Sequence, residues 1–429
     1  MPPLLRCLCL LAPALVFGQT GAPGLTAIQG VRVFDGESVL EGRTVLIRDG
    51  EIESVSGANA RIPQGAVVVP GTGRTLIPGL IDSHVHVSPA WPEEALHQAL
   101  EFGVTAVVDM WTNPPPPGFT FSLTRFKQLN AANRPDLAAV TSAGTGVTAP
   151  GGHTTQMEGG AGAAFLPVLS DASGADAFVA ARIAEGSDFI KMIVEDTNLV
   201  TGGKLPTLNN ETIAAVVQAA HARDRLAVAH VRSEQQARGA IGAGVDGLAH
   251  IFSGATASED FGKFVKSNGA FVIPTLTILY AVCGRSDGPA VLNSARVKEH
   301  VNAKFTYMLS APPLEHPLSC EGSTKAVHEL AEAGVRLLAG TDSPGMGTTY
   351  GASLHWELQH LVEAGLTPRQ ALASATSIPA DIFFKGGRRG RVRPGMRADL
   401  VLVEGDPTKQ IEDTRRIVQV WNRGVPLVR

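Results

Sequence analysis

The chain has 429 residues, of which 44% are hydrophobic and 18% charged, a balance typical of folded enzymes rather than of disordered or fibrous proteins. Its formal net charge of −4 leaves no basic surplus for broad attraction to nucleic acid, so we expect no nucleic-acid partner. Four cysteines are too few for a disulfide framework in a chain of this length. The length fits two or three domains of roughly 150 residues, or one α/β barrel with an additional domain.

Residues 1–18 have the layout of a secretory signal peptide. One arginine precedes an apolar stretch at 7–17, which is shorter than the ~20 residues that a membrane-spanning helix needs. We expect an exported protein, periplasmic or secreted, cleaved near Gly18; the alternative is an apolar N-terminus on a cytosolic enzyme. No later apolar run predicts a membrane span. Only Cys283 and Cys320 would remain after cleavage, and we expect two buried free thiols, with one disulfide as the alternative.

Both ends of the chain have hairpin-forming sequence. Residues 25–69 alternate between short β-branched runs and Asp-Gly or Glu-Gly turns, which predicts antiparallel hairpins. The same pattern returns at 398–406 and 416–429. A basic run precedes this second region, and we expect it to be a solvated link. Its members are Lys385, Arg388, Arg389, Arg391 and Arg393.

Between these ends, short apolar runs alternate with helical segments such as 211–224 and 233–244, which predicts βα units and a parallel sheet. Eight such units in about 300 residues are the number found in a (β/α)8 TIM barrel. A doubly wound sheet is the alternative, but polar residues cluster where the runs end, as expected at the functional face of a barrel. The expected strands are 79–87, 104–110, 137–143, 188–194, 226–231, 247–252, 270–278 and 335–342.

Five side chains at the ends of these runs are suited to binding metal. His84 and His86 lie two residues apart on one expected strand, so both point to the same face, the barrel interior. His230, His250 and Asp342 end three later runs. Burying such groups unpaired would cost several kcal/mol each, and coordination removes that cost. The sequence therefore predicts a metal centre whose N and O ligands suit Zn²⁺, Mn²⁺ or Co²⁺.

Lys191 is expected to point into the same interior, because it alternates with Phe189 and Ile193 along its strand. A buried lysine tends to become neutral, and a neutral amine can add carbon dioxide to form a carbamate that bridges two metals. The favoured interpretation is an N6-carboxylysine at Lys191. The alternative is an unmodified lysine paired with Glu195.

Six motifs in the chain resemble those of the amidohydrolase superfamily, and the resemblance runs from about Leu25 to Arg429. Within the superfamily, the chain is most similar to the binuclear, carboxylated-lysine branch with prolidase-like and imidazolonepropionase-like relatives. The motifs are IPGLIDSHVHV (77–87), FIKMI (189–193), AHV (229–231), LAHIF (248–252), AGTDSP (339–344) and ADLVLVEGDPT (398–408).

The resemblance implies a site with two divalent metal ions, expected to be Zn²⁺. His84, His86 and Asp342 would hold the first ion, His230 and His250 the second, and carboxylated Lys191 would bridge them. It also implies that the flanking β segments form one small composite β-sandwich domain, and that homo-oligomers are possible. The implied organisation is a signal peptide at 1–18, a β-sandwich domain from 19–76 and 386–429, and a barrel at 77–385.

The expected reaction is hydrolysis of an amide C–N bond in a dipeptide or an N-acyl amino acid, by a metal-bridged hydroxide whose proton Asp342 takes. The alternative is a cyclic amide hydrolase or a deaminase with a mononuclear site. A catalytically inactive binding protein is disfavoured because all six ligand positions are filled. Four further residues are candidates for binding the small-molecule substrate: His153, Arg232, Tyr280 and His355.

Overall fold

The computed structural model of the chain describes residues 24–112, 123–155, 165–198, 202–253, 257–312, 314 and 319–428. The expected signal peptide at 1–18 lies outside these residues. None of the described helices is both long enough and apolar enough to span a membrane.

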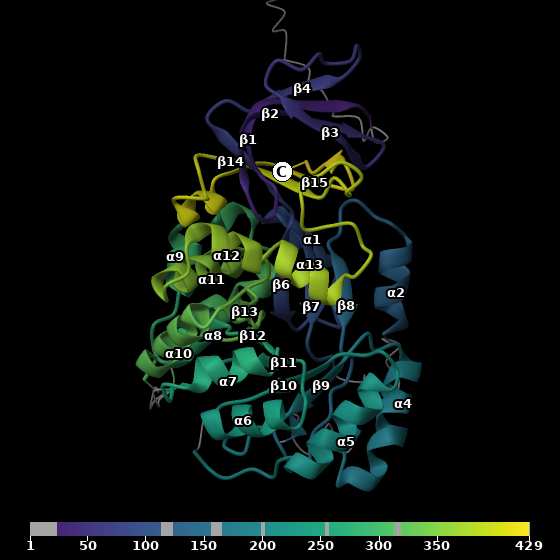
Figure 1. Cartoon of the computed structure of the whole chain (residues 1–429), viewed down its shortest axis with the longest axis vertical. Helices are drawn as coiled ribbons and strands as arrows, with labels where there is room; N and C mark the ends of the chain where they lie inside the picture. The colour runs from purple at the N-terminus through teal and green to yellow at the C-terminus, as the bar shows by residue number, and fades with distance from the viewer. Residues whose placement is uncertain are drawn as a thin grey trace, which may run out of the picture.

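Strands from both ends of the chain combine in one eight-stranded sheet, whose order is β16-β15-β14-β5-β1-β2-β3, with β4 also pairing with β1. The predicted antiparallel hairpins are present in β1–β3 and β14–β16. In Figure 1 the purple N-terminal strands and yellow C-terminal strands lie together at one end of the molecule. The strands are β1 (Thr26–Phe34), β2 (Val39–Arg48), β3 (Glu51–Gly57), β4 (Val67–Pro70), β5 (Arg74–Pro78), β14 (Leu400–Glu404), β15 (Ile417–Asn422) and β16 (Val425–Pro426).

Each of the eight apolar runs predicted as strands contains a strand, and these form two parallel sheets. Single parallel bridges join the two sheets at both edges, Val85 with Ser343 and Val147 with Met192. The strands follow one another in chain order, without the reversal of a doubly wound sheet. One sheet has β6 (Leu80–Val85), β7 (Val104–Asp109) and β8 (Ala139–Ser142); the other has β9 (Ile190–Ile193), β10 (Ala227–His230), β11 (Gly247–Ala249), β12 (Phe271–Ile273) and β13 (Arg336–Leu337).

Helices separate most of these strands and surround them (Figure 1). The expected helices at 211–224 and 233–244 are present as α5 and α6, and Ser233 forms a capping box with Gln236 at the start of α6. The α-helices are α1 (Pro92–Glu101), α2 (Thr124–Ala131), α4 (Ala175–Glu185), α5 (Asn210–His221), α6 (Glu234–Gly242), α7 (Phe261–Ser267), α8 (Leu276–Val282), α9 (Gly288–Asn293), α10 (Glu321–Glu332), α11 (Ala352–Glu363), α12 (Pro368–Ser374) and α13 (Ser377–Phe383). Short 3₁₀ helices are η1 (Ala172–Gly174), η2 (Lys298–His300), η3 (Ala303–Phe305), η4 (Tyr307–Ser310) and η5 (Ile411–Arg415).

The predicted strand at 270–278 was wrong in its second half, where helix α8 begins. The backbone of Thr275 turns the chain with φ 53°, and the buried carboxylate of Glu357 then accepts hydrogen bonds from the backbone N–H groups of Leu276 and Thr277 at 3.1 and 2.8 Å. A carboxylate at these unpaired amides stabilises a helix start, which the local sequence cannot reveal because Glu357 lies 80 residues away from Thr277.

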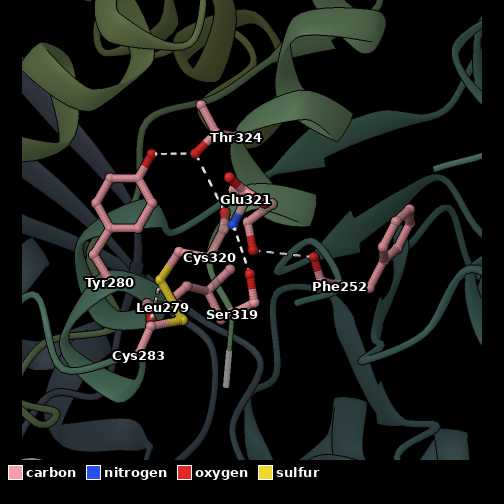
Figure 2. Close-up of a disulfide and its surroundings, with 9 residues drawn as sticks. Phe252, Leu279, Tyr280, Cys283, Ser319, Cys320, Glu321 and Thr324 are labelled. Atoms are coloured by element: carbon pink, nitrogen blue, oxygen red, sulfur yellow. Dashed lines mark hydrogen bonds between the residues drawn. A yellow bond between two sulfur atoms is a disulfide. The ribbon is translucent and has the colours of Figure 1, made fainter. Parts of the chain in front are cut away.

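Cys283 and Cys320 form a disulfide, so the expectation of two free thiols was wrong (Figure 2). Their Cα atoms are 5.9 Å apart, within the usual range for a disulfide. The bond connects the C-cap of α8 to the N-cap of α10. It therefore tethers two helices that are 37 residues apart in the sequence.

Candidate active site

A cavity of about 590 Å³ lies at the carboxyl ends of the parallel strands. His84 lies in β6, Lys191 in β9 and His230 at the end of β10, His86 and His250 directly follow β6 and β11, and Asp342 lies in the segment after β13. All six predicted metal ligands line the cavity, together with two of the four predicted substrate-binding residues: His84, His86, Lys191, His230, His250, Asp342, His153 and Arg232.

His84, His86 and Asp342 form one candidate ligand group. The Nε2 atoms of His86 and His84 lie 2.8 and 3.1 Å from the same Asp342 oxygen, Oδ1. His86 Nδ1 lies 3.1 Å from the carbonyl oxygen of Trp111, which can only accept, so Nδ1 carries the proton. In a neutral ring, Nε2 then presents a lone pair to a carboxylate oxygen. Two lone pairs at this distance repel, and a proton or cation between them removes the repulsion.

A second candidate group consists of His153, Glu195 and His230. Glu195 Oε2 lies 2.9 Å from His230 Nε2 and 3.4 Å from His153 Nδ1, while Oε1 lies 3.2 Å from Arg232 Nε. Burial raises the pKa of Glu195, against the opposing charges of Arg232 and His153. Sequence reasoning considered Glu195 only as a partner for Lys191. In the described part of the chain the two form no ion pair, because His230, His153 and Arg232 surround the carboxylate instead.

His250 lies between the two groups. Its ring centroid is 4.6 Å from that of His84 and 4.5 Å from that of His230, and its Nδ1 lies 2.7 Å from Thr275 Oγ1. Both His250 and Asp342 have left-handed backbones, with φ of 69° and 60°. Such conformations cost about 1–3 kcal/mol in non-glycine residues and concentrate at functional sites.

Burial controls the protonation of the site. It lowers the pKa of the Lys191 ammonium to about 7, although nearby carboxylates pull in the other direction. It likewise lowers the pKa of His84 to about 3 and those of His230 and His250 well below their ordinary value. Burial opposes ionisation of Asp342, but the neighbouring His84 and His250 outweigh it and hold the carboxyl pKa well below its usual value. The imidazoles of His84, His230 and His250 are therefore neutral around an ionised carboxylate. For His86 burial acts in the same direction, but the neighbouring Asp342 outweighs it and raises the pKa.

These residues fit divalent metal ions. Neutral imidazole and carboxylate are the protonation states that bind cations, and N and O donors suit Zn²⁺ and related ions. Nδ1 of the buried His84 has no hydrogen-bond partner among the described residues, which is costly unless another group binds it. His84, His86 and Asp342 could hold one ion, and His230 with His250 or with His153 and Glu195 a second.

Two predicted substrate-binding residues, Tyr280 and His355, are not among the residues that line the cavity. Tyr280 lies on α8 and its hydroxyl is 2.7 Å from Thr324 Oγ1, next to the disulfide (Figure 2). His355 lies on α11, where its Nε2 is 3.0 Å from the carbonyl oxygen of Phe102. Both side chains are almost fully buried. We expected both residues near the site because each follows a predicted strand in the sequence. Both lie on helices, however, and their side chains point into the protein interior.

The remaining wall of the cavity is apolar, and sequence reasoning missed it. Its residues come from the segments after β6, β12 and β13, whereas the polar side chains His153, Glu195 and Arg232 follow β8, β9 and β10. Strands β12 and β13 and the bridged β6 are neighbours, and so are β8, β9 and β10, so the apolar and the polar side chains come from two separate groups of adjacent strands. The apolar wall includes Trp91, Ile278, Leu279, Val282, Tyr307 and Met346.

The chain is similar to several known proteins. Ochratoxinase from Aspergillus niger is 26% identical over 219 residues, which make up 50% of this chain but only 40% of that protein. An uncharacterised protein from Mycobacterium bovis is 26% identical over 375 residues, 84% of this chain and 85% of its own. A solved structure of an Xaa-Pro dipeptidase with bound methionine in the active site has a TM-score of 0.75 at 20% identity and covers 94% of this chain and 100% of that one, which shows a shared fold. The sequence profile of the amidohydrolase family matches residues 75–427, so the chain belongs to that family.

Proposed function

We propose that this protein is a divalent-metal-dependent amidohydrolase that cleaves the amide bond of an N-acyl amino acid. The observation that carries the proposal is the convergence of the two ligand groups, one around Asp342 and one around Glu195, with Lys191 in the same cavity. The names of similar proteins, an ochratoxinase and an Xaa-Pro dipeptidase, support hydrolysis of an amide.

In this proposal, His84, His86 and Asp342 hold one ion and His230 with His250 the other, expected to be Zn²⁺. Lys191 Nζ would add to the carbon of CO₂ with release of one proton, and the oxygens of the resulting N6-carboxylysine would serve as further metal ligands. Its burial among these ligands supports the assignment, since burial disfavours the ammonium form. When bound, such ions supply Lewis-acid activation of a carbonyl group and of water.

Asp342 is the proposed proton carrier. Its carboxylate accepts a proton from the attacking water, and then donates it to the amide nitrogen as the C–N bond breaks. The second proton of the water leaves the new carboxyl group and protonates the amine, so the products are a carboxylate and an ammonium ion, and atoms and charge balance. His84 and His86 orient the carboxylate from two sides, through their Nε2 contacts to Oδ1.

Arg232 is the proposed binding group for the substrate carboxylate. Its side chain is largely buried at the cavity, and Nη2 has no hydrogen-bond partner among the described residues while Nε contacts Glu195. A guanidinium pairs well with a carboxylate, so an amino-acid leaving group would lie on this polar side. The acyl group would then extend toward the apolar wall.

The proposal is tested by metal removal. The purified chain is expected to contain about two metal equivalents, to lose hydrolysis of N-acyl amino acids after chelation, and to regain it with Zn²⁺. Metal analysis and a hydrolysis screen over N-acyl amino acids, dipeptides and cyclic amides measure this. Full activity in the metal-free protein would contradict the proposal. One equivalent with unmodified Lys191 and a preference for cyclic amides would favour the mononuclear alternative.

The apolar wall predicts a preference for long acyl groups over dipeptides. The side chains of the apolar wall offer no counterion to the α-ammonium of a dipeptide, and the two carboxylates among the described cavity residues already have partners: Glu195 contacts His230 and Arg232, and Asp342 contacts His84 and His86. Because each buried methylene contributes about 0.8 kcal/mol, kcat/KM should rise about fourfold per methylene from acetyl to hexanoyl substrates.

Two variants of the apolar wall and one control variant test whether this wall causes the preference for long acyl groups. Trp91 and Tyr307 are 42% and 62% exposed, so Trp91→Ala and Tyr307→Ala should fold normally and flatten the chain-length dependence. Phe165→Ala, a similarly exposed aromatic residue that does not line the cavity, should leave it unchanged. Equal kcat/KM for acetyl and hexanoyl substrates in the unaltered protein would exclude an acyl site at this wall.

Three structural expectations complete the proposal. We interpret the two bridged parallel sheets as one closed (β/α)8 barrel at 77–385, with the mixed sheet as a composite domain from 19–76 and 386–429.

We also propose export, because disulfides persist in oxidising compartments and Cys283 is bonded to Cys320. A homo-oligomer is consistent with this organisation, and gel filtration with light scattering tests it.

A further inference from the structure

A second pocket, of about 350 Å³, lies at the opposite end of the parallel strands from the active site. Its lining includes Ala139, the first residue of β8, whereas the active site lies beyond the carboxyl ends of the strands. It is enclosed by the end of α2, the end of α13, the segment before β14 and the turn between β15 and β16. In Figure 1, α13 is drawn below β15, and Phe383 at the end of α13 lines the pocket together with Ala139 of β8.

Three guanidinium groups define this arginine pocket: Arg389, Arg397 and Arg423. Arg397 Nη2 lies 2.8 Å from an oxygen of Asp399, and the other oxygen of Asp399 accepts a hydrogen bond from the backbone N–H of Arg423. Arg389 is only 7% exposed and forms no ion pair among the described residues. We predicted from the sequence that the basic run from Lys385 to Arg393 is solvated. For Arg389 this prediction was wrong, because its side chain is buried.

Several nitrogens of these groups lack acceptors. Nε and Nη1 of Arg389 are buried without a hydrogen-bond partner among the described residues, and so are the Nε atoms of Arg397 and Arg423. The guanidinium of Arg389 stacks on the ring of Phe384 at 4.7 Å, which positions it but offers no strong acceptor. Buried N–H donors of a charged group are costly to leave unpaired.

The charges of the pocket do not balance either. Lys127 is paired with Asp188, and Arg397 with Asp399, which leaves the charges of Arg389 and Arg423 uncompensated. Burial lowers the pKa of Arg389 to about 10, and the positive charges of Arg397 and Arg423 act in the same direction, whereas the negative charge of Asp399 opposes the shift. The Arg389 guanidinium is therefore still charged at neutral pH. An occupant with two negative charges would neutralise the excess.

We propose that the arginine pocket binds a small doubly charged oxyanion, a phosphate group or a dicarboxylate. Guanidinium groups pair with such anions through parallel N–H···O bonds, and the unpaired Nε and Nη1 atoms supply the donors. The bound anion would connect α2 and β8 to the segment before β14 and to the β15–β16 turn. It therefore stabilises the junction between the mixed sheet and the parallel sheets.

The test measures thermal stability of the metal-loaded full chain. Addition of inorganic phosphate or succinate, at ionic strength matched with NaCl, should raise Tm by on the order of 2 °C and saturate, and calorimetric titration should give one site. A response to phosphate alone, to succinate alone or to both identifies the anion class. No response beyond that of NaCl would refute the proposal.

Arg389→Gln should abolish the anion response, and in anion-free buffer its Tm should equal or exceed that of the unaltered chain, because an uncompensated charge is removed. Arg388→Gln is the matched control: Arg388 pairs with Glu51 at 2.7 Å outside the pocket, so the response should persist. Arg423→Gln serves as a second variant if Arg389→Gln fails to fold. Retention of the full response in a folded Arg389→Gln protein would place the anion elsewhere, for example at the metal centre, and overturn the proposal.

Discussion

Replacement of Asp342 by asparagine is expected to lower kcat by about two to four orders of magnitude, the usual contribution of a general acid–base group. The amide has the shape of the carboxylate but cannot carry a proton between water and a leaving nitrogen. It also loses the negative charge that His84 and His86 share at Oδ1. Steady-state kinetics at fixed Zn²⁺ measure the loss, and circular dichroism tests whether the fold is retained.

The control for this variant is Asp176→Asn. Asp176 has a side chain that is 76% exposed and pairs with Arg223 on the surface, far from any proposed chemistry. It should retain full activity. If Asp342→Asn retains kcat within a factor of about ten of the unaltered enzyme, Asp342 is not the proton carrier, even if it binds metal. Metal analysis of the same sample separates the two roles.

Replacement of Lys191 by alanine is expected to lower kcat/KM by about 100-fold or more and to reduce the metal content. In the proposed site the carboxylated side chain supplies the oxygens that bridge both ions, and alanine supplies none. Added acetate or propionate should partly restore activity, since a small carboxylate can occupy the space that the shorter side chain leaves. Mass spectrometry of the unaltered, native protein should show the mass of one added CO₂.

Lys204→Ala is the matched control, because the Lys204 side chain is 91% exposed and forms only a 3.9 Å ion pair with Asp196. It should have unchanged metal content and no response to acetate. Unchanged metal content together with unchanged activity in Lys191→Ala would exclude a bridging role. Loss of activity without rescue and without a CO₂ mass in the native protein would instead indicate an unmodified lysine.

The residues of the metal centre could be predicted because each follows from a local pattern. His84 and His86 alternate on one apolar run, and three further runs end in His230, His250 and Asp342, so a polar group at a strand end signals a site whatever surrounds it. The structure indeed brings all six predicted ligands to one cavity. What these residues bind remains a proposal.

Side chains outside the strands could not be placed in this way. Glu195 lies beyond β9, and its contacts with His153 and Arg232 join segments that follow three different strands. Tyr280 and His355 had suitable positions in the sequence, but they lie on helices whose other contacts decide where their side chains point. Such contacts depend on the packing of whole elements rather than on neighbouring residues.

The sequence by itself determined the alternation of parallel strands with helices, the hairpins at both ends of the chain and the approximate positions of the strands, since period and turn residues are local properties of the chain. The tertiary structure alone decided the Cys283–Cys320 disulfide, the grouping around Glu195, the apolar wall and the burial of Arg389. Each of these features depends on contacts between residues that are far apart in the sequence. The distances between those residues are fixed only when the two ends of the chain and the parallel sheets pack together.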